Sequence, residues 1–265
     1  MSKKKNKRIR INSKKMIMSV LLILVFIGVV VLGTILCSKK NDSKKEIKLN
    51  FASRINELEN FNPGNYYKFG WLQVQGTNID IPVLDPSAAT DEVQYSFAWN
   101  SPMYVSGKGI DMLLGHNVVN VSSQPLLPDK KLKNFEELMA FVYHSFASEN
   151  LYAQYTKDGK DNVYMLYAIR FNGYDGNDFI NFISKEEKEK YIKNAIDNSI
   201  YDFDIDVNAD DDLLQLKTCT RMFGTVENQQ IMLEYRKIRK NEKTYKYSVK
   251  KNKKYKTLNI KEEKM

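Results

Sequence analysis

Cysteine and histidine are scarce in this chain of 265 residues, which contains two of each. Cys37 ends a long apolar run and Cys219 lies far along the chain, so no intrachain disulfide is expected between them. The Cys and His spacings of zinc fingers are missing, as are recognition-helix patterns and aromatic-glycine RNA motifs. These absences argue against an internal disulfide, a zinc finger and a nucleic-acid partner. The sequence also contains no internal repeat.

Positive charge is concentrated in the flanks of the chain. The formal net charge is +9, with lysines crowding the first 15 residues, residues 39–48 and the segment after Arg236. The middle, from about Asn50 to Glu234, is close to neutral or acidic. This distribution favours contact with an anionic surface over a fold that reads nucleic acid.

One long hydrophobic run, Met16 to Cys37, carries no charge, and about 20 apolar residues suffice to cross a bilayer as a helix. Basic residues are denser before the run than after it, which predicts that residues 1–15 are a cytoplasmic tail and that the rest of the chain is extracellular. A cleaved signal peptide and a lipoprotein are the alternatives. The run is too long for the first, and Thr34-Ile-Leu-Cys37 lacks the small residues of the second. We therefore predict a single-pass anchor in the cell membrane at 16–37.

The anchor is followed by a predicted linker and amphipathic helix at 38–60, where Ile47, Phe51, Ile55 and Leu58 recur at helical spacing. At the other end of the chain, residues 239–265 form a Lys-rich tail that is predicted to be poorly ordered. This tail is a candidate for contact with anionic wall polymers or lipid headgroups.

Residues 61–238 between these flanks are predicted to form one domain. Ser184 and Glu187 form a capping box that predicts a helix running to about Ile200, and a shorter helix is expected at 134–141. Six to eight short strands favour a mixed β, barrel-like fold with peripheral helices over alternating βαβ units. The clearest predicted strands are 70–74, 79–84, 111–114, 151–155, 162–170, 213–218 and 230–238.

Cys219 ends the apolar run that begins at Leu213, just before a polar loop. A thiol in this position is either an exposed nucleophile or a small buried hydrophobe. His116 also follows a short strand, and a nearby imidazole can accept the proton of a thiol. The order of histidine before cysteine disfavours a papain-like arrangement. His144, within Phe-Val-Tyr-His-Ser-Phe, is interpreted as packed or connecting structure.

An acidic cluster precedes the cysteine strand. Calcium ligation is one interpretation, since calcium prefers oxygen ligands, but the glycine and terminal Glu of an EF-hand loop are missing. We favour a solvated acidic loop and predict no metal or cofactor. The cluster consists of Asp202, Asp204, Asp206, Asp210, Asp211 and Asp212.

Two segments resemble motifs of the sortase family. Leu-Leu-Gly-His116-Asn is similar to its strand-end histidine, and Gln-Leu-Lys-Thr-Cys219 to its Thr-Leu-x-Thr-Cys signature. Residues 70–83, Gly-Trp-Leu-Gln-Val-Gln-Gly-Thr-Asn-Ile-Asp-Ile-Pro-Val, look like the first hairpin of class B sortases. The helix from Ser184 is also similar to the class B pattern. The resemblance covers roughly Asn50 to Ile238.

This resemblance implies a closed β-barrel of about eight strands and a cysteine transpeptidase at the cell wall of a Gram-positive bacterium. Cys219 would attack the Thr carbonyl of a sorting signal in a secreted protein and form a thioacyl intermediate. An amino group of a peptidoglycan precursor or of another protein would resolve it. His116 would act as general acid and base.

The chain departs from the family pattern at two positions. Gln215 replaces the leading Thr of the signature, which we interpret as a strand-surface change. Gln230 stands where the family places an arginine that steadies substrate and oxyanion, and loss of such a donor typically costs about 10²–10³ in rate. Arg221, in the loop after Cys219, is the candidate substitute, because Arg236 lies too far along the strand; a solvated loop charge is the other interpretation of Arg221.

Three functions are therefore open at this point. The first is a membrane-anchored sortase-type transpeptidase, and the second, suggested by Gln230, is a catalytically weakened surface binding or assembly module. The third is an extracellular cysteine hydrolase that releases its product to water.

Overall fold

The computed structural model describes residues 45–62, 67–85, 103–105, 109–115, 134–173, 182, 184–220, 229–253 and 255. The chain divides into two units, residues 1–45 and residues 46–265, and the fold below is that of the second. The predicted anchor at 16–37 lies outside the described residues. Among those described, no helix has the length and apolar character needed to cross a bilayer.

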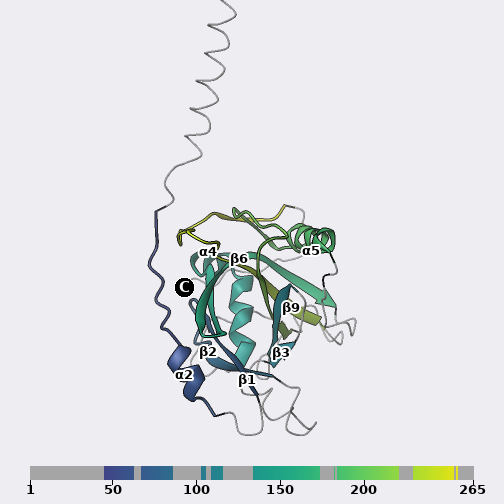
Figure 1. The fold of residues 1–265 in the computed structure, drawn as a ribbon. Helices are drawn as coiled ribbons and strands as arrows, with labels where there is room; N and C mark the ends of the chain where they lie inside the picture. The colour runs from purple at the N-terminus through teal and green to yellow at the C-terminus, as the bar shows by residue number, and fades with distance from the viewer. Residues whose placement is uncertain are drawn as a thin grey trace, which may run out of the picture. The chain divides into compact units, whose positions relative to one another are not determined.

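A single curled sheet forms the body of the domain (Figure 1). The strands pair in the order β1-β2-β3-β4-β8-β9-β6-β5, and pairing of β1 with β5 closes the sheet into a barrel. The contact between β2 and β3 is the weakest, a single parallel pair of Leu84 with Met103. The strands are β1 (Tyr67–Val74), β2 (Asp80–Asp85), β3 (Met103–Val105), β4 (Ile110–Leu114), β5 (Tyr152–Lys157), β6 (Lys160–Gly173), β8 (Leu213–Cys219) and β9 (Gln229–Lys237).

The mixed β fold expected from the sequence is confirmed. The predicted hairpin of residues 70–84 is the antiparallel pair β1–β2, and the predicted final pair is β8–β9. The turn between β5 and β6 places Asp158 and Gly159 at positive φ, which Asp and Gly tolerate better than most residues.

The sheet has two apolar faces because alternate residues of a strand point to opposite sides. Leu214 and Leu216 of β8 face the main core, which also holds the buried residues of the 3-10 helix η2 (Asn134–Val142) and of α4 (His144–Glu149). Leu213 belongs instead to a second cluster on the outer face. β8 is therefore covered on both sides, and six of its seven residues are buried.

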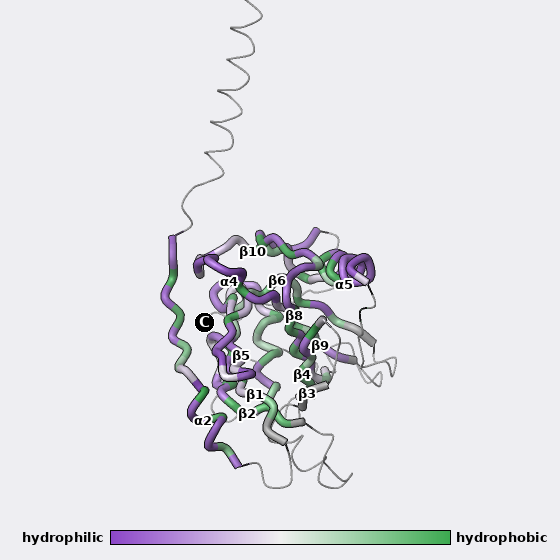
Figure 2. Tube along the Cα trace, in the orientation of Figure 1, coloured by the Kyte–Doolittle hydropathy of each residue, from purple (hydrophilic) through white to green (hydrophobic). Residues whose placement is uncertain are grey.

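Helix α5 (Lys185–Asp197) covers part of the outer face, next to β6 (Figure 1). The predicted capping box is confirmed in part, since Ser184 Oγ accepts a hydrogen bond from Glu187 N at 3.2 Å. Ile192 and Ala195 pack in the outer cluster. Most of the remaining residues of the helix are hydrophilic, as its largely purple colouring in Figure 2 shows, and Ile196 is an exposed exception.

Residues 38–60 were predicted to be a linker and an amphipathic helix, and the helix is wrong over most of the described part. Only α2 (Ile55–Asn60) is helical, and residues 47–54 form an extended strap along the barrel. The amides of Gln73 and Gln154 both donate to Ala52 O, at 2.8 and 2.7 Å. Glu46 forms a β-bridge with Tyr245. These long-range hydrogen bonds outweigh the local helical pattern.

The expectation of a poorly ordered tail is also wrong for residues 239–253. β10 (Val249–Lys251) pairs with β7 (Tyr201–Phe203) in a small second sheet. Tyr247 and Val249 are buried, whereas the lysines that alternate with them are exposed. A strand pattern is thus present within a Lys-rich composition.

Candidate functional site

Cys219 is an exposed thiol at the last position of β8. The strand is buried from Leu213 to Thr218, and the burial ends at the cysteine itself. The interpretation of Cys219 as a small buried hydrophobe is therefore wrong. A strand that is fixed on both sides holds this thiol and leaves it accessible, which is what a nucleophile requires.

The ends of three strands meet at this thiol. Cys219 pairs with Gln230 of β9 in the antiparallel ladder, and Lys217 pairs with Leu114 of β4 in the parallel one. Gly115 N donates to Lys217 O at 3.1 Å, so the link from β4 to β8 continues one residue past β4. His116 follows Gly115 in the chain but lies outside the described residues, as does Arg221.

Gly115 has no room for a side chain. A Cβ atom on it would lie 2.5 Å from Phe135 Cγ and 3.0 Å from Phe135 Cβ, closer than such atoms approach. The glycine of the Leu-Leu-Gly-His motif thus lets helix η2 pack against the end of β4. The backbone directly before His116 is fixed by this contact and by the hydrogen bond to β8.

Gln230 stands directly opposite Cys219 and is 4% exposed. Arg236 does not reach this position, because it pairs with Leu213 at the other end of the ladder. Its guanidinium binds Glu242 at 2.5 and 2.6 Å and donates to Asp206 O. The prediction that Arg236 is too distant is confirmed.

A buried polar cluster lies on the same face of the sheet as Cys219. Glu234 of β9 is 0% exposed, and its carboxylate accepts from Arg170 Nε at 2.9 Å and from Gln215 Nε2 at 2.9 Å. Tyr191 of α5 donates to both carboxylate oxygens, at 2.9 and 2.8 Å. We call these four residues the Glu234 cluster. It ties α5, β6, β8 and β9 together.

Gln215 is consequently no strand-surface residue, and that interpretation is wrong. It is 1% exposed, and its amide donates to both Glu234 and Tyr191. The signal for this cluster was a polar residue in each of two apolar strands, Leu-Leu-Gln215-Leu and Met-Leu-Glu234-Tyr. Partners on other elements were needed to recognise it.

Two groups of the Glu234 cluster, Tyr191 and Arg170, have raised pKa values. Burial, together with the charge of Glu234, raises the pKa of Tyr191 well above its usual value, so the phenol stays a donor. Burial by itself would lower the pKa of Arg170, but Glu234 outweighs it and the net direction is upward. Neither group titrates in the physiological range.

Arg239 and Lys185 form ion pairs with the acidic cluster that precedes β8. Arg239 binds Asp211 through Nε and Nη2 at 2.6 and 2.8 Å, and Nη1 binds Asp206 at 2.7 Å. Lys185 pairs with Asp210. Burial alone would raise the pKa of Asp211, but the hydrogen bonds from Arg239 and the Asn208 amide lower it overall. All of these carboxylates except Asp211 are exposed, which agrees with the interpretation as a solvated acidic loop; Asp211 is buried against Arg239.

His144 has a structural environment, as expected. Its Nε2 lies 2.9 Å from Val249 O, and its ring packs edge-on against Tyr201. It thereby links α4 to the small β7–β10 sheet.

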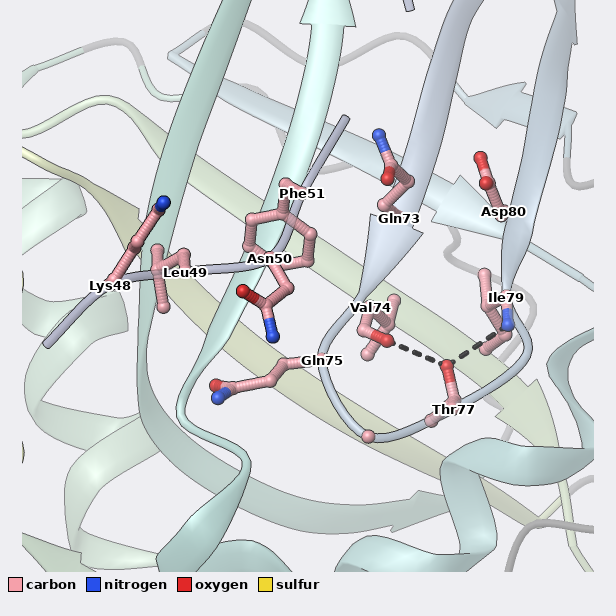
Figure 3. A pocket seen from close by; sticks show the side chains of 11 residues that line it. Lys48, Leu49, Asn50, Phe51, Gln73, Val74, Gln75, Thr77, Ile79 and Asp80 are labelled. Atoms are coloured by element: carbon pink, nitrogen blue, oxygen red, sulfur yellow. Dashed lines mark hydrogen bonds between the residues drawn. The ribbon is translucent and has the colours of Figure 1, made fainter. Parts of the chain in front are cut away.

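A cavity of about 290 Å³, which Cys219 does not line, lies at the turn between β1 and β2 (Figure 3). Thr77 closes the turn by donating to Val74 O and accepting from Ile79 N, as the dashed lines show. Gln73 and Gln75, which line the cavity, already bind the backbone of other segments. The contact of Gln73 holds the strap and those of Gln75 hold the start of β5, so these side chains have structural roles.

Three comparisons place this geometry among known proteins. No family model and no curated protein matches the chain. Sortase B of Clostridium perfringens matches with a TM-score of 0.55 at 24% identity, over 69% of this chain and 99% of that one. Sortase B from the type II pilus of Streptococcus pneumoniae matches with a TM-score of 0.52 at 19% identity, over 71% and 98%.

The Staphylococcus aureus sortase B–substrate complex matches with a TM-score of 0.54 at 15% identity, over 78% of this chain and 91% of that one. At these identities the likeness shows the fold. The resemblance seen in the Cys219 strand and the first hairpin therefore extends to the architecture, and the chain has a fold of the sortase B type.

Proposed function

We propose that the chain is a membrane-anchored cysteine transpeptidase of the sortase B type. The observation that carries the proposal is the exposed Cys219 at the end of β8. In the same strand, Lys217 O accepts a hydrogen bond from Gly115 N, the residue that precedes His116 in the chain. A sortase-like fold adds support, since the same fold is found in structures described as sortase B with a substrate and with triglycine.

The reaction begins with the Cys219 thiolate. Its sulfur forms a bond to the Thr carbonyl carbon of a sorting signal, and the carbonyl electrons move onto oxygen. When the oxyanion collapses, the C–N bond breaks and the His116 imidazolium gives a proton to the leaving amine. The products of this half-reaction are a thioacyl enzyme and the released C-terminal fragment.

In the second half-reaction His116 acts as a base, where it acted as an acid in the first. An amino group of a peptidoglycan precursor or a surface protein attacks the thioester carbon and gives its proton to His116. The C–S bond breaks, an amide forms and the thiolate returns. No metal or cofactor takes part in these steps.

The direct experiment supplies the full chain with a sorting-signal peptide and triglycine and follows the ligated product by mass spectrometry. Wild type should give the amide product, and Cys219→Ala and His116→Ala should give none above background. Peptide cleavage that yields hydrolysis product alone, at every triglycine concentration, would instead identify a cysteine hydrolase.

A binding or assembly module is the second candidate, and Gln230 opposite Cys219 favours it. A neutral amide stabilises an oxyanion less than a guanidinium does. The two candidates differ in their response to a thiol-trapping substrate analogue. Labelling of Cys219 supports the transpeptidase, and a bound but unlabelled analogue supports the module.

We also propose that residues 16–37 anchor the chain in the cell membrane, with residues 1–15 in the cytoplasm. The domain would then face the extracellular substrates that the transpeptidase requires. Protease treatment of intact cells should digest the domain and spare an epitope placed before residue 16. Protection of the domain would contradict this topology.

A further inference from the structure

The chain that follows β9 carries its lysines on the surface of the domain. Residues 240–253 contain six lysines, all exposed, whereas Tyr247 and Val249 between them are buried. The one carboxylate of the segment, Glu242, binds the buried guanidinium of Arg236. Because the buried side chains fix the backbone, these charges belong to a folded surface, which we call the lysine surface. Its members are Lys240, Lys243, Lys246, Lys250, Lys251 and Lys253.

The beginning of the strap lies against this segment. Ile47 N donates to Thr244 O at 3.0 Å, and Thr244 Oγ1 donates to Ile47 O at 2.5 Å. Lys48, the next residue of the strap, is a seventh exposed lysine. The proposed anchor ends at Cys37, nine residues before Glu46, and nine residues span at most about 32 Å. Such an anchor would therefore keep the lysine surface within reach of the bilayer.

Acidic neighbours offset only part of this charge. Two of the lysines form ion pairs, at 2.8 and 2.5 Å, but both pairs are exposed, and such pairs are weak enough to exchange for another anion. Among the described residues, seven lysines stand against four neighbouring carboxylates, which leaves a net charge of +3. The carboxylates are Glu46 and Glu149, which form the pairs with Lys243 and Lys246, Asp202, which lies opposite Lys250, and Asp204, which binds the backbone of Ser248.

A surface of this charge fits phosphate. An ammonium group binds phosphate as a point charge, and about four to eight basic residues beside a membrane are the pattern that recognises anionic lipids. We propose that the lysine surface binds the phosphate headgroups of anionic lipids in the membrane that holds the anchor, and so orients the domain on the bilayer. Anionic wall polymers share this chemistry, but the short tether raises the effective concentration of the lipid and not of the polymer. The inference rests on the proposed anchor and not on the transpeptidase reaction.

Lipid contact at the lysine surface would not cover the Cys219 thiol. The segment leaves β9 after Lys237, at the end of the ladder where Arg236 pairs with Leu213. Cys219 is six residues further along β8, roughly 20 Å at the rise of a strand. We therefore expect the thiol to stay accessible to substrates while the lysine surface rests on the bilayer.

The test is amine footprinting of the full chain in vesicles of phosphatidylcholine, with or without phosphatidylglycerol. A membrane-impermeant acetylating reagent modifies exposed lysines, and mass spectrometry gives the rate at each one relative to Lys160, which is exposed at the turn between β5 and β6. Phosphatidylglycerol should slow acetylation of the lysine surface about fivefold relative to Lys160. High salt should remove this protection. Equal relative rates in the two kinds of vesicle would overturn the proposal.

A matched pair of variants separates this surface from the net charge of the chain. Replacing three of its lysines by glutamine should abolish most of the protection of the others. The same loss of charge from exposed positions of α5 should leave the protection unchanged, and loss of protection in both variants would overturn the proposal. The variants are Lys246→Gln/Lys250→Gln/Lys253→Gln for the lysine surface and Lys185→Gln/Lys190→Gln/Lys193→Gln for α5.

Three further measurements distinguish the inference from its alternatives. A chain that fails to float with phosphatidylcholine vesicles, yet floats and is protected with phosphatidylglycerol, would refute the anchor and support the lipid-binding surface. Protection that appears only when a phosphate-containing wall polymer is added would assign the surface to that polymer and overturn the proposal. Iodoacetamide should alkylate Cys219 at the same rate in both kinds of vesicle, and slower alkylation with phosphatidylglycerol would contradict the proposed orientation.

Discussion

The two ends of the β8–β9 ladder differ in the charged residues that they carry and in how these residues are paired. At the Leu213 end, Arg236 is 1% exposed and is matched by Glu242, and the neighbouring Arg239 is matched by Asp206 and Asp211. At the other end, an exposed thiol faces the neutral Gln230 across the ladder. Arginine thus closes the end that is structural, and the end that bears the nucleophile lacks one opposite Cys219.

The difference shows that the position of a residue along the ladder limits the role that it can have, whatever its residue type. Arg236 belongs to the same strand as Gln230, yet six residues of strand separate them, roughly 20 Å. Lys217 lies two residues before Cys219 on the same face of β8 and is buried, whereas Cys219 is exposed. The Glu234 cluster lies between the two ends and ties them to α5.

The largest effect is expected when the Glu234 cluster is broken. Glu234→Ala should lower the free energy of unfolding by about 3–5 kcal/mol, because it leaves the buried guanidinium of Arg170 without its carboxylate. Urea denaturation measures this loss. Glu46→Ala, which removes an exposed partner of Lys243, is the control and should have a barely measurable cost. Similar costs for the two variants would contradict the role of the cluster.

A smaller effect is expected at the Cys219 end from Gly115→Ala. The added methyl group meets the Phe135 ring, so stability should fall by about 1–3 kcal/mol. Ligation should fall about 100-fold, because the segment before His116 shifts relative to Cys219. Phe135→Ala in the same chain removes the ring atoms that the methyl group meets and should recover part of the ligation loss, at its own cost in stability. Full activity in Gly115→Ala would show that the close approach has no functional role.

At the Arg236 end, Arg239→Gln tests the charge matching through pH. The pKa of Asp211 is lowered in the folded state, so this contact stabilises fully above the usual value of about 4 and loses its effect as pH falls through the lowered folded value. Arg239→Gln should therefore cost about 1 kcal/mol at pH 7 and converge with wild type in acid. Lys185→Gln, in a fully exposed pair, should cost nothing measurable. A pH-independent cost for Arg239→Gln would contradict the assignment.

The smallest effect is expected from Tyr235→Phe, inside the barrel between the two ends. The Tyr235 hydroxyl is buried and finds no hydrogen-bond partner among the described residues, so its removal should be neutral or slightly stabilising. Tyr247→Phe is the matched comparison. Its hydroxyl binds Leu166 O at 2.7 Å, and its loss should cost about 1 kcal/mol by thermal unfolding. A larger cost for Tyr235→Phe would reveal a partner for that hydroxyl.

Seven of the strands were predictable from the sequence because alternation and turn residues are local signals, whereas the three-residue strands β3, β7 and β10 were missed. The pairing of β8 with β9 agrees with the predicted final strand pair, and the register adds that Gln230 lies opposite Cys219. The extended strap was missed because Ile47 and Phe51 fit a helical spacing equally well, and the amides that hold the strap lie in distant strands. Local spacing cannot distinguish these two outcomes.

The burial of polar residues in β8 could also not be predicted from local sequence patterns. Gln215 and Lys217 have the same appearance in sequence as solvent-facing strand residues, but both are buried, and Gln215 binds Tyr191 of α5 and Glu234 of β9. The ordered tail was missed because its lysines dominate the composition, while Tyr247 and Val249 carry the contacts. His116 and Arg221 lie outside the described residues, so their roles stay predictions.

The central claim is that Cys219 is the acyl-accepting nucleophile. Intact-protein mass spectrometry of the full chain after incubation with a sorting-signal peptide tests it most directly. The account predicts a mass increase equal to the acyl portion of the peptide, located at Cys219, released by hydroxylamine and missing in Cys219→Ala. An adduct that persists in Cys219→Ala, or a wild-type chain that is never acylated although its thiol reacts with iodoacetamide, would contradict it.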